Sequence, residues 1–315
     1  KQDIFEEWTT YAQKKTLQER NLDFESIIRN SKLKLIAITG IRRAGKSSVL
    51  MLLAQKLSRE GKKVAYINLE DSRLKGDSAI LDEILKWFGE EGFLLLDEIT
   101  SANDWEGWLA RTHELLKGTL QIIASSSRSG LTRPHKSLRG RIMFIKMHPL
   151  SFKEFLNFKS INVEKTTVGK GRVETALKEY LQLGGFPEVV LTKDELDKVT
   201  LLNSYFREII GLDVAEAAHK DLSIVENFGR YIIESSSFSA SKCLNFFKTL
   251  GYKIGKEKIL ALEYYSQESC LFYFNEIFSY SIKDRLQYSR KCYLGDIGFS
   301  YAITGKIDLG KLFEN

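Results

Sequence analysis

The chain has 315 residues, of which 43% are hydrophobic and 28% are charged, and its 47 basic and 41 acidic residues give a net charge of +6. This composition excludes wholesale disorder and allows about two domains with buried cores. No apolar run approaches the roughly 20 residues of a membrane span, and the N-terminus has no secretory pattern. Three widely spaced cysteines favour a reducing compartment over a disulfide framework or a zinc site. We therefore expect a cytoplasmic protein without a membrane segment.

The first predicted elements are a strand, a glycine-containing loop and a helix. The strand is the apolar run Leu33–Thr39, and the helix-forming run Ser48–Leu57 follows the loop. The loop, residues 40–47, reads GIRRAGKS and has the spacing GxxxxGK[ST] in its required context. Glycines let backbone N–H groups approach phosphate oxygens, and the helix N-terminus adds the positive end of its dipole. The residues expected to bind ATP or ADP are Gly40, Arg42, Arg43, Ala44, Gly45, Lys46, Ser47 and Ser48. Lys46 would reach the β- and γ-phosphates, and Ser47 would offer its hydroxyl to Mg²⁺.

Two acidic residues follow the third predicted strand. Strands are predicted at residues 63–69 and 93–96, and the latter runs directly into Asp97 and Glu98. Ligands bind at the carboxyl ends of strands in open α/β sheets. Asp97 suits the carboxylate that orients Mg²⁺, and Glu98 suits a general base that polarises the attacking water. The plain alternative is a strand end with two solvated acids.

A fourth strand is predicted at residues 120–124 and ends in three serines, Ser125–Ser127. A hydroxyl at this strand end could hold the attacking water or a γ-phosphate oxygen. We assign that role to Ser125, with ordinary loop serines as the alternative.

Residues 115–153 contain no acidic side chain and carry a summed charge of +8. The basic residues are Lys117, Arg128, Arg133, Lys136, Arg139, Arg141, Lys146 and Lys153. A solvated basic face is one interpretation, and a surface for polyanions is the other: nucleotide phosphates at a subunit boundary, or DNA. Either Arg139 or Arg141, with Arg141 preferred, is our candidate for an arginine that stabilises transition-state charge, in its own subunit or a neighbour's. We accordingly expect a homo-oligomer.

The second half of the chain is predicted to be mainly helical. Helices are expected at residues 172–183 and 194–210, and Gly184-Gly185 marks a turn between them. Residues 221–315 read as two helices, 239–250 and 256–265, and two strands, 271–280 and 291–294, which is the outline of a winged helix. The net charge of this module is only +1, so contact with DNA and contact with a protein both stay open. Core packing is the preferred explanation for its aromatic residues Phe272, Tyr273, Phe274, Phe278 and Tyr280.

Six local segments carry a family resemblance. They are residues 38–47, 95–99, 124–127, 140–155 (GR leading to PLSFKEF), 184–189 (GGFPEV) and 291–299 (KCYLGDIGF). In these segments the chain resembles archaeal and bacterial AAA-like P-loop ATPases that carry a helical lid, a winged helix and a nuclease-like C-terminal domain. The resemblance implies the roles given above for Lys46, Ser47, Asp97 and Glu98, a strand-end sensor at Ser125 and a phosphate-sensing arginine at Arg141. It also implies a lid that swings with the nucleotide state.

Two departures from the family pattern concern the sensor and the end of the chain. Ile123-Ala124 stands where the family usually has Thr-Gly, which puts the sensor role of Ser125 in doubt. The sequence stops at Asn315, where the nuclease-like domain would begin, so the sequence reads as a fragment of a longer chain.

These observations predict an α/β fold of the P-loop NTPase class, AAA-like and of the additional-strand type, with a parallel sheet core. The expected domains are the ATPase core (1–152), a helical lid (153–220) and a winged helix (221–315). The expected function is Mg²⁺-dependent ATP hydrolysis coupled to binding or remodelling of DNA, through the basic segment 115–153 and the winged helix. The main alternative is a nucleotide-controlled signalling switch that acts on a protein partner. A small-molecule kinase is the third, and the acidic pair with a separate lid favours water as the acceptor instead.

Overall fold

The computed structural model describes residues 1–127, 138–235 and 237–306, and in it the chain divides into two compact units. Unit 1 comprises Lys1–Gly40 and Gly45–Met147. Unit 2 comprises Ile41–Ala44 and His148–Asn315. Four residues of the glycine-containing loop, 41–44, therefore belong to the second unit. The residues on either side of them, Gly40 and Gly45, belong to the first.

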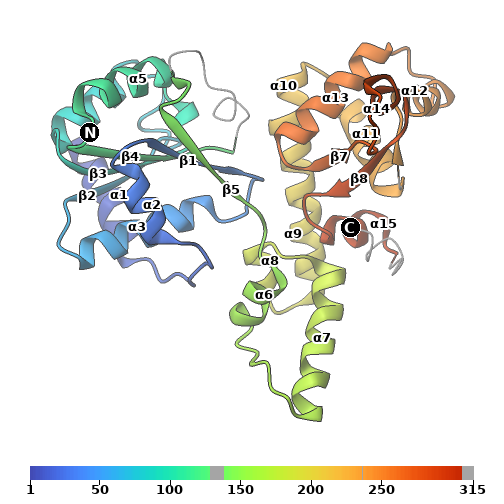
Figure 1. Cartoon of the computed structure of the whole chain (residues 1–315), viewed down its shortest axis with the longest axis horizontal. Helices are drawn as coiled ribbons and strands as arrows, with labels where there is room; N and C mark the ends of the chain where they lie inside the picture. The colour runs from blue at the N-terminus through green and yellow to red at the C-terminus, as the bar shows by residue number, and fades with distance from the viewer. Residues whose placement is uncertain (128–137, 236, 307–315) are drawn as a thin grey trace. The chain divides into compact units, whose positions relative to one another are not determined.

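A five-stranded parallel sheet forms the centre of unit 1 (Figure 1). Its strands, in chain order, are β1 (Leu35–Gly40), β2 (Val64–Asn68), β3 (Gly92–Asp97), β4 (Leu120–Ser125) and β5 (Ile142–Met147). Their order across the sheet is β2-β3-β4-β1-β5. Because β4 pairs with both β1 and β3, the sheet has the predicted additional strand between them.

Strands β1 to β4 follow the sequence prediction closely because they are largely apolar on both faces. Every residue of β1 and β4 is buried, as expected of a parallel strand covered on both sides. Strand β5 was not predicted. It is an edge strand whose residues are mostly half-exposed or exposed, so it lacks the continuous apolar run that identifies the other strands.

Helices cover both faces of this sheet, with α5 and α3 on opposite sides in Figure 1. The helices of unit 1 are α1 (Gln2–Lys14), α2 (Phe24–Ser31), α3 (Lys46–Arg59), α4 (Ile80–Phe88), the short 3₁₀-helix η1 (Ile99–Ser101) and α5 (Trp105–Leu116). Helices α4 and α5 share one hydrophobic core with the side chains of Ala37, Ile67 and Leu94. The Trp108 side chain is buried in that core, and its Nε1–H donates to Asp82 at 2.9 Å.

Unit 2 consists of helices and a three-stranded antiparallel sheet. Its first elements are α6 (Phe152–Phe158), α7 (Thr167–Leu183), α8 (Pro187–Leu191), α9 (Glu195–Glu208), the π-helix η4 (Ile209–Ala215) and α10 (Glu216–Ala218). There follow α11 (Leu222–Glu234), β6 (Ser237–Phe238), α12 (Ala240–Thr249), α13 (Lys256–Glu268), β7 (Phe272–Asn275), α14 (Ile282–Gln287), β8 (Arg290–Leu294) and α15 (Gly298–Thr304). The sheet order is β6-β8-β7.

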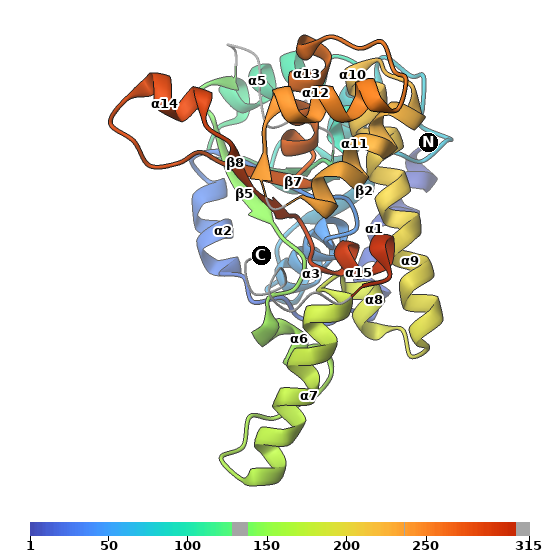
Figure 2. The same cartoon turned by 90° about the vertical axis from the view of Figure 1, so that its right-hand side faces the viewer.

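The strand predicted at 271–280 is shorter than expected. Strand β7 ends at Asn275, and the connection to β8 then leaves the sheet and includes α14 (Figure 2). Phe272 and Phe274 are buried as predicted, but Phe278 and Tyr280 are 87% and 95% exposed. Core packing was therefore the wrong explanation for these two rings, because the chain has left the sheet before it reaches them.

Asp296 joins two of the segments that carry the family resemblance. Its carboxylate accepts hydrogen bonds from the backbone N–H groups of Gly185 at 2.8 Å and Gly298 at 2.9 Å. Beside it the rings of Phe186 and Phe299 are in contact, with centroids 5.3 Å apart. The GGFPEV and LGDIGF segments, which are more than 100 residues apart in sequence, thus form one buried cluster within unit 2.

Candidate nucleotide-binding site

The GxxxxGK[ST] loop leaves β1 at Gly40 and enters helix α3 at Lys46. Gly40 has a φ of +136°, and a Cβ at this position would lie 2.0 Å from the carbonyl oxygen of Met147. Gly45 precedes the helix with a φ of +95°. Both positions therefore require glycine, the first because β5 approaches closely and the second because the backbone is left-handed. Ala44 is fully buried, and Ser48 lies in the first turn of the helix.

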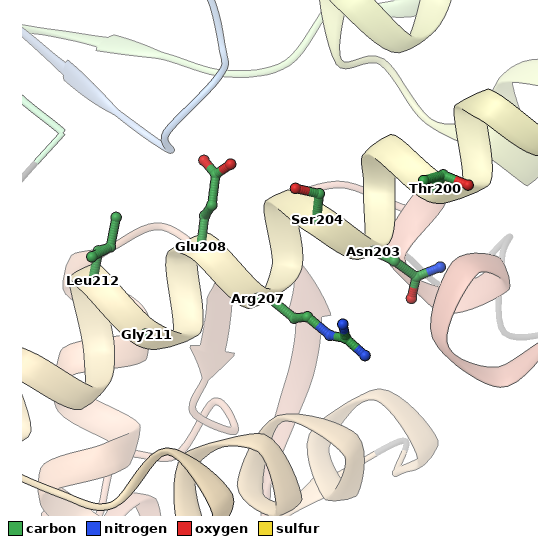
Figure 3. A pocket seen from close by; sticks show the side chains of 7 residues that line it. All are labelled: Thr200, Asn203, Ser204, Arg207, Glu208, Gly211 and Leu212. Atoms are coloured by element: carbon green, nitrogen blue, oxygen red, sulfur yellow. The ribbon is translucent and has the colours of Figure 1, made fainter.

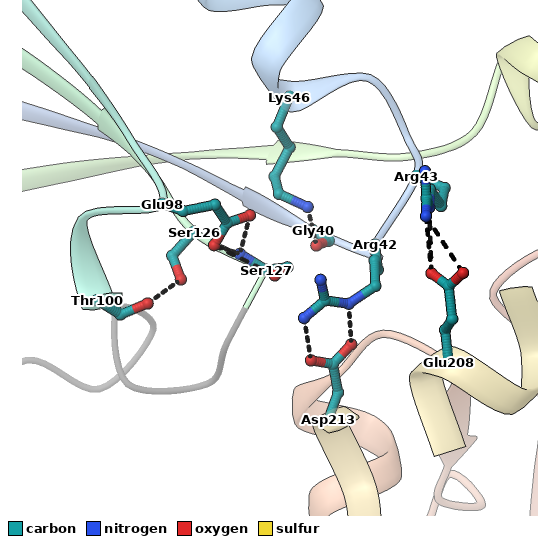
Figure 4. Close-up of polar contacts among 10 residues, drawn as sticks. All are labelled: Gly40, Arg42, Arg43, Lys46, Glu98, Thr100, Ser126, Ser127, Glu208 and Asp213. Carbon is teal, nitrogen blue, oxygen red and sulfur yellow. Dashed lines mark hydrogen bonds and ion pairs between the residues drawn. The ribbon is translucent and has the colours of Figure 1, made fainter. Parts of the chain in front are cut away.

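Lys46 lies at the N-terminus of α3 with its side chain largely buried, at 5% exposure. Its ammonium group donates a hydrogen bond to the carbonyl oxygen of Gly40 at 3.0 Å (Figure 4). The lysine is thus folded back against the loop that it follows. A positive group and the N–H groups of the first helical turn together form a site suited to an anion.

Asp97, at the end of β3, is the centre of a buried hydrogen-bond cluster. The side chains of Ser47 and Ser125 both hydrogen-bond to its carboxylate, and the Tyr66 hydroxyl donates to it at 2.7 Å. Burial raises the pKa of Asp97, and these three hydrogen bonds oppose that rise. The structure therefore brings together Ser47 and Asp97, the two residues predicted to hold Mg²⁺, together with Ser125.

Glu98 follows with a left-handed backbone, at a φ of +51°. Its N–H donates to Ser125 Oγ at 3.1 Å, so the same serine contacts both acidic residues. Its carboxylate accepts from the Ser127 N–H at 3.1 and 3.2 Å and from the Ser127 hydroxyl at 3.3 Å (Figure 4). Predicted site residues from the ends of β3 and β4 are thus adjacent, as expected for neighbouring parallel strands.

Arg42 and Arg43, also predicted to bind the nucleotide, have acidic partners within unit 2. The Arg42 guanidinium contacts Asp213 at 3.0 and 3.1 Å through two hydrogen bonds. Arg43 contacts Glu208 at 3.0 to 3.2 Å (Figure 4). In this structure both guanidinium groups are thus engaged by carboxylates.

Arg141 lies away from this loop within unit 1. It precedes β5, and its carbonyl oxygen accepts from the N–H of Leu35, the first residue of β1, whereas the loop follows the last residue of that strand. Its guanidinium pairs with Glu114 at 2.9 Å. The structure does not bring Arg141 to the phosphate loop of its own chain. Arg139 is exposed beside it.

Three of the eight basic residues of segment 115–153 lie outside the described residues: Arg128, Arg133 and Lys136. Of the others, Lys117, Lys146 and Lys153 are exposed. Glu114 comes just before the segment, and its pairing with Arg141 reduces the local excess of positive charge.

Several residues of the site were not predicted from the sequence. Tyr66 is a β2 residue, and nothing in its sequence context distinguishes it from an ordinary core tyrosine. Ser127 was seen only as part of a serine run. Asp213 and Glu208 lie about 170 residues after the loop, on helices whose other charged residues look the same in sequence.

Comparison with known proteins finds a matching family model for each of two parts of the chain. Residues 32–156 match a family described as an AAA domain, and residues 174–309 match a family described as a domain of unknown function. The uncharacterized protein MJ1544 of Methanocaldococcus jannaschii is 33% identical over 307 residues, which cover 94% of this chain and 67% of that protein. The chain belongs to the MJ1544 family. With its AAA match and its parallel sheet, it carries a nucleotide-binding α/β fold of the P-loop ATPase class.

A bacterial protein is also similar to this chain. An uncharacterized protein of Haemophilus influenzae is 31% identical over 203 residues, which cover 60% of this chain and 48% of the bacterial protein. The chain therefore spans about two thirds of the archaeal relative and about half of the bacterial one.

Three solved structures align with most of the chain at low identity. A DNA replication initiation factor aligns with a TM-score of 0.33 and 17% identity, over 82% of this chain and 91% of that one. DnaA from Aquifex aeolicus bound to AMPPCP aligns with a TM-score of 0.35 and 17% identity, over 80% and 90%. Replication initiator DnaA bound to AMPPCP and single-stranded DNA aligns with a TM-score of 0.35 and 16% identity, over 84% and 93%. Among the described residues, no helix is both long and apolar enough to cross a membrane.

Proposed function

We propose that this chain is a Mg²⁺-dependent ATPase whose nucleotide cycle acts on DNA. The observation that carries the ATPase proposal is the closeness of Ser47 to the buried carboxylate of Asp97. The hydroxyl that follows the loop lysine lies beside the carboxylate at the end of β3. Binding of Mg²⁺ and a triphosphate by a P-loop protein needs these two groups side by side.

The proposed roles follow from the positions of the side chains. Lys46 would neutralise charge on the β- and γ-phosphates, and Gly45 leaves the loop backbone free to approach them. Glu98 would polarise the attacking water, because it is the second carboxylate at this strand end. Ser125 would orient both acids, since its hydroxyl contacts Asp97 and accepts from the N–H of Glu98.

The residues present fit a magnesium ion. No group of three or more His, Cys, Asp or Glu side chains that could hold a metal occurs among the described residues. Mg²⁺ needs no such cage, because it is commonly bound by one or two carboxylates, waters and the substrate phosphates. Asp97 and Ser47 supply oxygen atoms, and a divalent cation would favour the ionised form of a carboxylate whose pKa burial raises. When bound, the ion would neutralise charge that develops on the phosphates.

We keep the core (1–152), the helical lid (153–220) and the winged helix (221–315) as proposed domains. The element order α11, β6, α12, α13, β7, α14, β8 supports the last of these. Apart from α14 in the connection between the last two strands, helix, strand, two helices and two strands is the order of a winged helix. DNA would be bound by this module and by the exposed lysines of segment 115–153.

Homo-oligomerisation is also part of the proposal. Arg141 lies at the edge of the sheet opposite the phosphate loop, so any phosphate that it contacts would belong to a neighbouring copy. Such an arginine in trans would stabilise charge on the transferred phosphoryl group.

A signalling switch that acts on a protein partner is the second candidate. The contacts of Arg42 and Arg43 with Asp213 and Glu208 favour it, because they pair two residues of the loop with carboxylates of the same unit. The low net charge of residues 221–315 favours it as well. The two candidates share the ATP site and differ in what the bound nucleotide controls.

Steady-state ATP hydrolysis with Mg²⁺, with and without single- and double-stranded DNA, tests the proposal. Lys46→Ala should abolish nucleotide binding. Glu98→Gln should retain binding and lower kcat by about 10²- to 10⁴-fold, the usual contribution of a general base. Glu91→Gln, an exposed carboxylate at the other end of β3, is the matched control and should keep wild-type turnover.

The outcomes separate the candidates. Stimulation by DNA that disappears at high salt supports action on DNA. Slow ATP hydrolysis at a rate that DNA does not change, with ADP retained through purification, supports the signalling switch. Full activity of Glu98→Gln would overturn the assigned base under either proposal.

A further inference from the structure

A buried ion pair within unit 2 engages Arg42, one of the four loop residues that belong to this unit. The Arg42 Nε–H donates to Asp213 Oδ2 at 3.1 Å and an Nη2–H donates to Oδ1 at 3.0 Å, so that both carboxylate oxygens are engaged. The Asp213 side chain is 2% exposed and the Arg42 side chain 14%. Separating this pair would remove two charge-assisted hydrogen bonds from a buried carboxylate, which is strongly unfavourable.

A second, more exposed pair lies beside the first. Arg43 contacts Glu208 at 3.0 to 3.2 Å, and its guanidinium lies 5.3 Å from the ring centre of Tyr205. The side chains of Arg43 and Glu208 are 46% and 30% exposed. Glu208 also borders a hollow of about 630 Å³ along α9, where it projects in a different direction from the neighbouring Arg207 (Figure 3). Water therefore screens this pair more than the Arg42 pair.

Both carboxylates belong to one continuous helical segment. Glu208 is the last residue of α9, and Asp213 lies in the π-helix η4 that continues it. Single-turn π-helical segments often occur at functional sites. Tyr205 of the same segment donates its hydroxyl to Glu188 of the GGFPEV motif. The segment is thus connected to the nucleotide loop at one side and to that motif at the other.

We propose that Asp213 and Glu208 are positioning residues that control how fast nucleotide leaves the site. This inference rests on the proposed nucleotide binding. The four residues Ile41–Ala44 supply backbone N–H groups of the phosphate loop, and the two arginine pairs restrict their conformation. Nucleotide release needs the loop to loosen, and Asp213 opposes loosening because Arg42 would have to leave a buried carboxylate.

The same coupling must act in both directions. If the α9–η4 segment stabilises the nucleotide-bound loop, then bound nucleotide stabilises the α9–η4 segment by the same factor. Asp213 and Glu208 therefore report nucleotide occupancy to unit 2.

The test is the dissociation rate of a fluorescent ADP analogue, chased with excess ADP in the presence of Mg²⁺. Asp213→Asn and Glu208→Gln keep side-chain size and remove the charge. We expect faster release from both, with Asp213→Asn nearer the upper end of the 5- to 150-fold range that is usual for coupled sites. Arg42→Ala and Asp213→Asn are also combined. The double variant should release ADP no faster than the faster of these two single variants, because both changes remove the same ion pair. Glu216→Gln, an exposed carboxylate just beyond η4, is the control.

A second measurement does not depend on the variants folding correctly. Backbone hydrogen exchange of residues 209–215 in the wild-type chain should slow when Mg²⁺ and ADP are bound. Release from both variants within twofold of Glu216→Gln, or exchange that is unchanged by nucleotide, would overturn the inference. A wild-type chain that binds no nucleotide would overturn the proposed function and this inference together, whereas normal binding with unaltered release overturns only the inference.

Discussion

At Asp97, burial and hydrogen bonding act in opposite directions on one carboxylate. Burial raises its pKa, and hydrogen bonds from Ser125, Ser47 and Tyr66 stabilise the charged form. The first two partners were expected near this position, because both follow strands whose carboxyl ends lie at one edge of a parallel sheet. Tyr66 was not, because its closeness depends on the register that pairs it with Leu95 across β2 and β3. Register between strands is a property of the assembled sheet.

Asp296 provides a prediction of pH-dependent stability. Burial raises its pKa to about 6, against the two backbone hydrogen bonds that favour its charged form. An aspartate in an unfolded chain has a pKa of about 3.9. Between these two values the native state binds the proton more tightly than the unfolded state does. The free energy of unfolding should therefore fall as pH rises from about 4 to about 6, by an amount on the order of 1–3 kcal/mol.

Urea unfolding of the wild-type chain and of Asp296→Asn at pH 4.5 and 6.5 measures this effect. Other titrating groups cancel in the difference between the two proteins, so the wild type should lose stability relative to the variant as pH rises. Asp221→Asn, at an exposed helix start, should follow the wild type. Parallel pH dependence of wild type and Asp296→Asn would show that Asp296 keeps an ordinary pKa in the folded chain.

Among the elements, the turn after helix α7 depends on very close contacts. A Cβ at Gly185 would lie 2.3 Å from the backbone oxygen of Leu150, and the Gly185 carbonyl accepts from the N–H of Leu150 at 2.7 Å. The two backbones can approach so closely only without a side chain at this position. The glycine pair predicted a turn here, but the segment that packs against it, at Leu150, is known only from the fold.

Replacing Gly185 by alanine should therefore be strongly destabilising. We expect a loss of more than about 2 kcal/mol in the free energy of unfolding, as for other substitutions that force a buried backbone apart. Gly171→Ala is the matched control, because Gly171 lies inside α7 with nothing within 4 Å of an added Cβ. It should stabilise by about 0.5–1 kcal/mol through helix propensity. Thermal or urea unfolding of both variants measures these changes. Equal changes in the free energy of unfolding would contradict the close contact at Leu150.

Elements differ in how far the sequence predicts them. The predicted ends of strands β1 to β4 lie within about two residues of the observed ends, because continuous apolar runs identify strands buried on both faces. Strand β5 was missed, since an edge strand with exposed Phe144 and Lys146 lacks that pattern. The helix predicted at 194–210 is present, but its continuation as the π-helix η4 was not foreseen. Such an insertion depends on the packing of the folded chain.

For the molecule as a whole, the acid-free segment 115–153 predicts how DNA affinity depends on salt concentration. Its exposed lysines would contact phosphates without reading sequence, so their removal should weaken binding to all DNA sequences alike. Each of Lys117→Gln and Lys153→Gln should reduce the slope of log affinity against log salt by about 1. Lys62→Gln, also exposed but outside the segment, is the control. Fluorescence anisotropy over a salt series measures the slopes, and unaltered slopes would remove this segment from the DNA-binding surface.

The amino-acid sequence alone was sufficient to predict the phosphate loop, the acidic pair after β3 and the additional-strand core. The loop and the acidic pair depend on local signals: the spacing of glycines and lysine, and apolar runs that end in acids. The additional-strand order of the sheet is what the family resemblance implied. The tertiary structure decided which groups complete the site. Tyr66 meets Asp97, Asp213 meets Arg42 and Asp296 meets Gly185 through contacts between residues 31, 171 and 111 positions apart. No local pattern marks such partners, because a buried carboxylate or hydroxyl is selected by the polar group opposite it, and folding alone brings the two together.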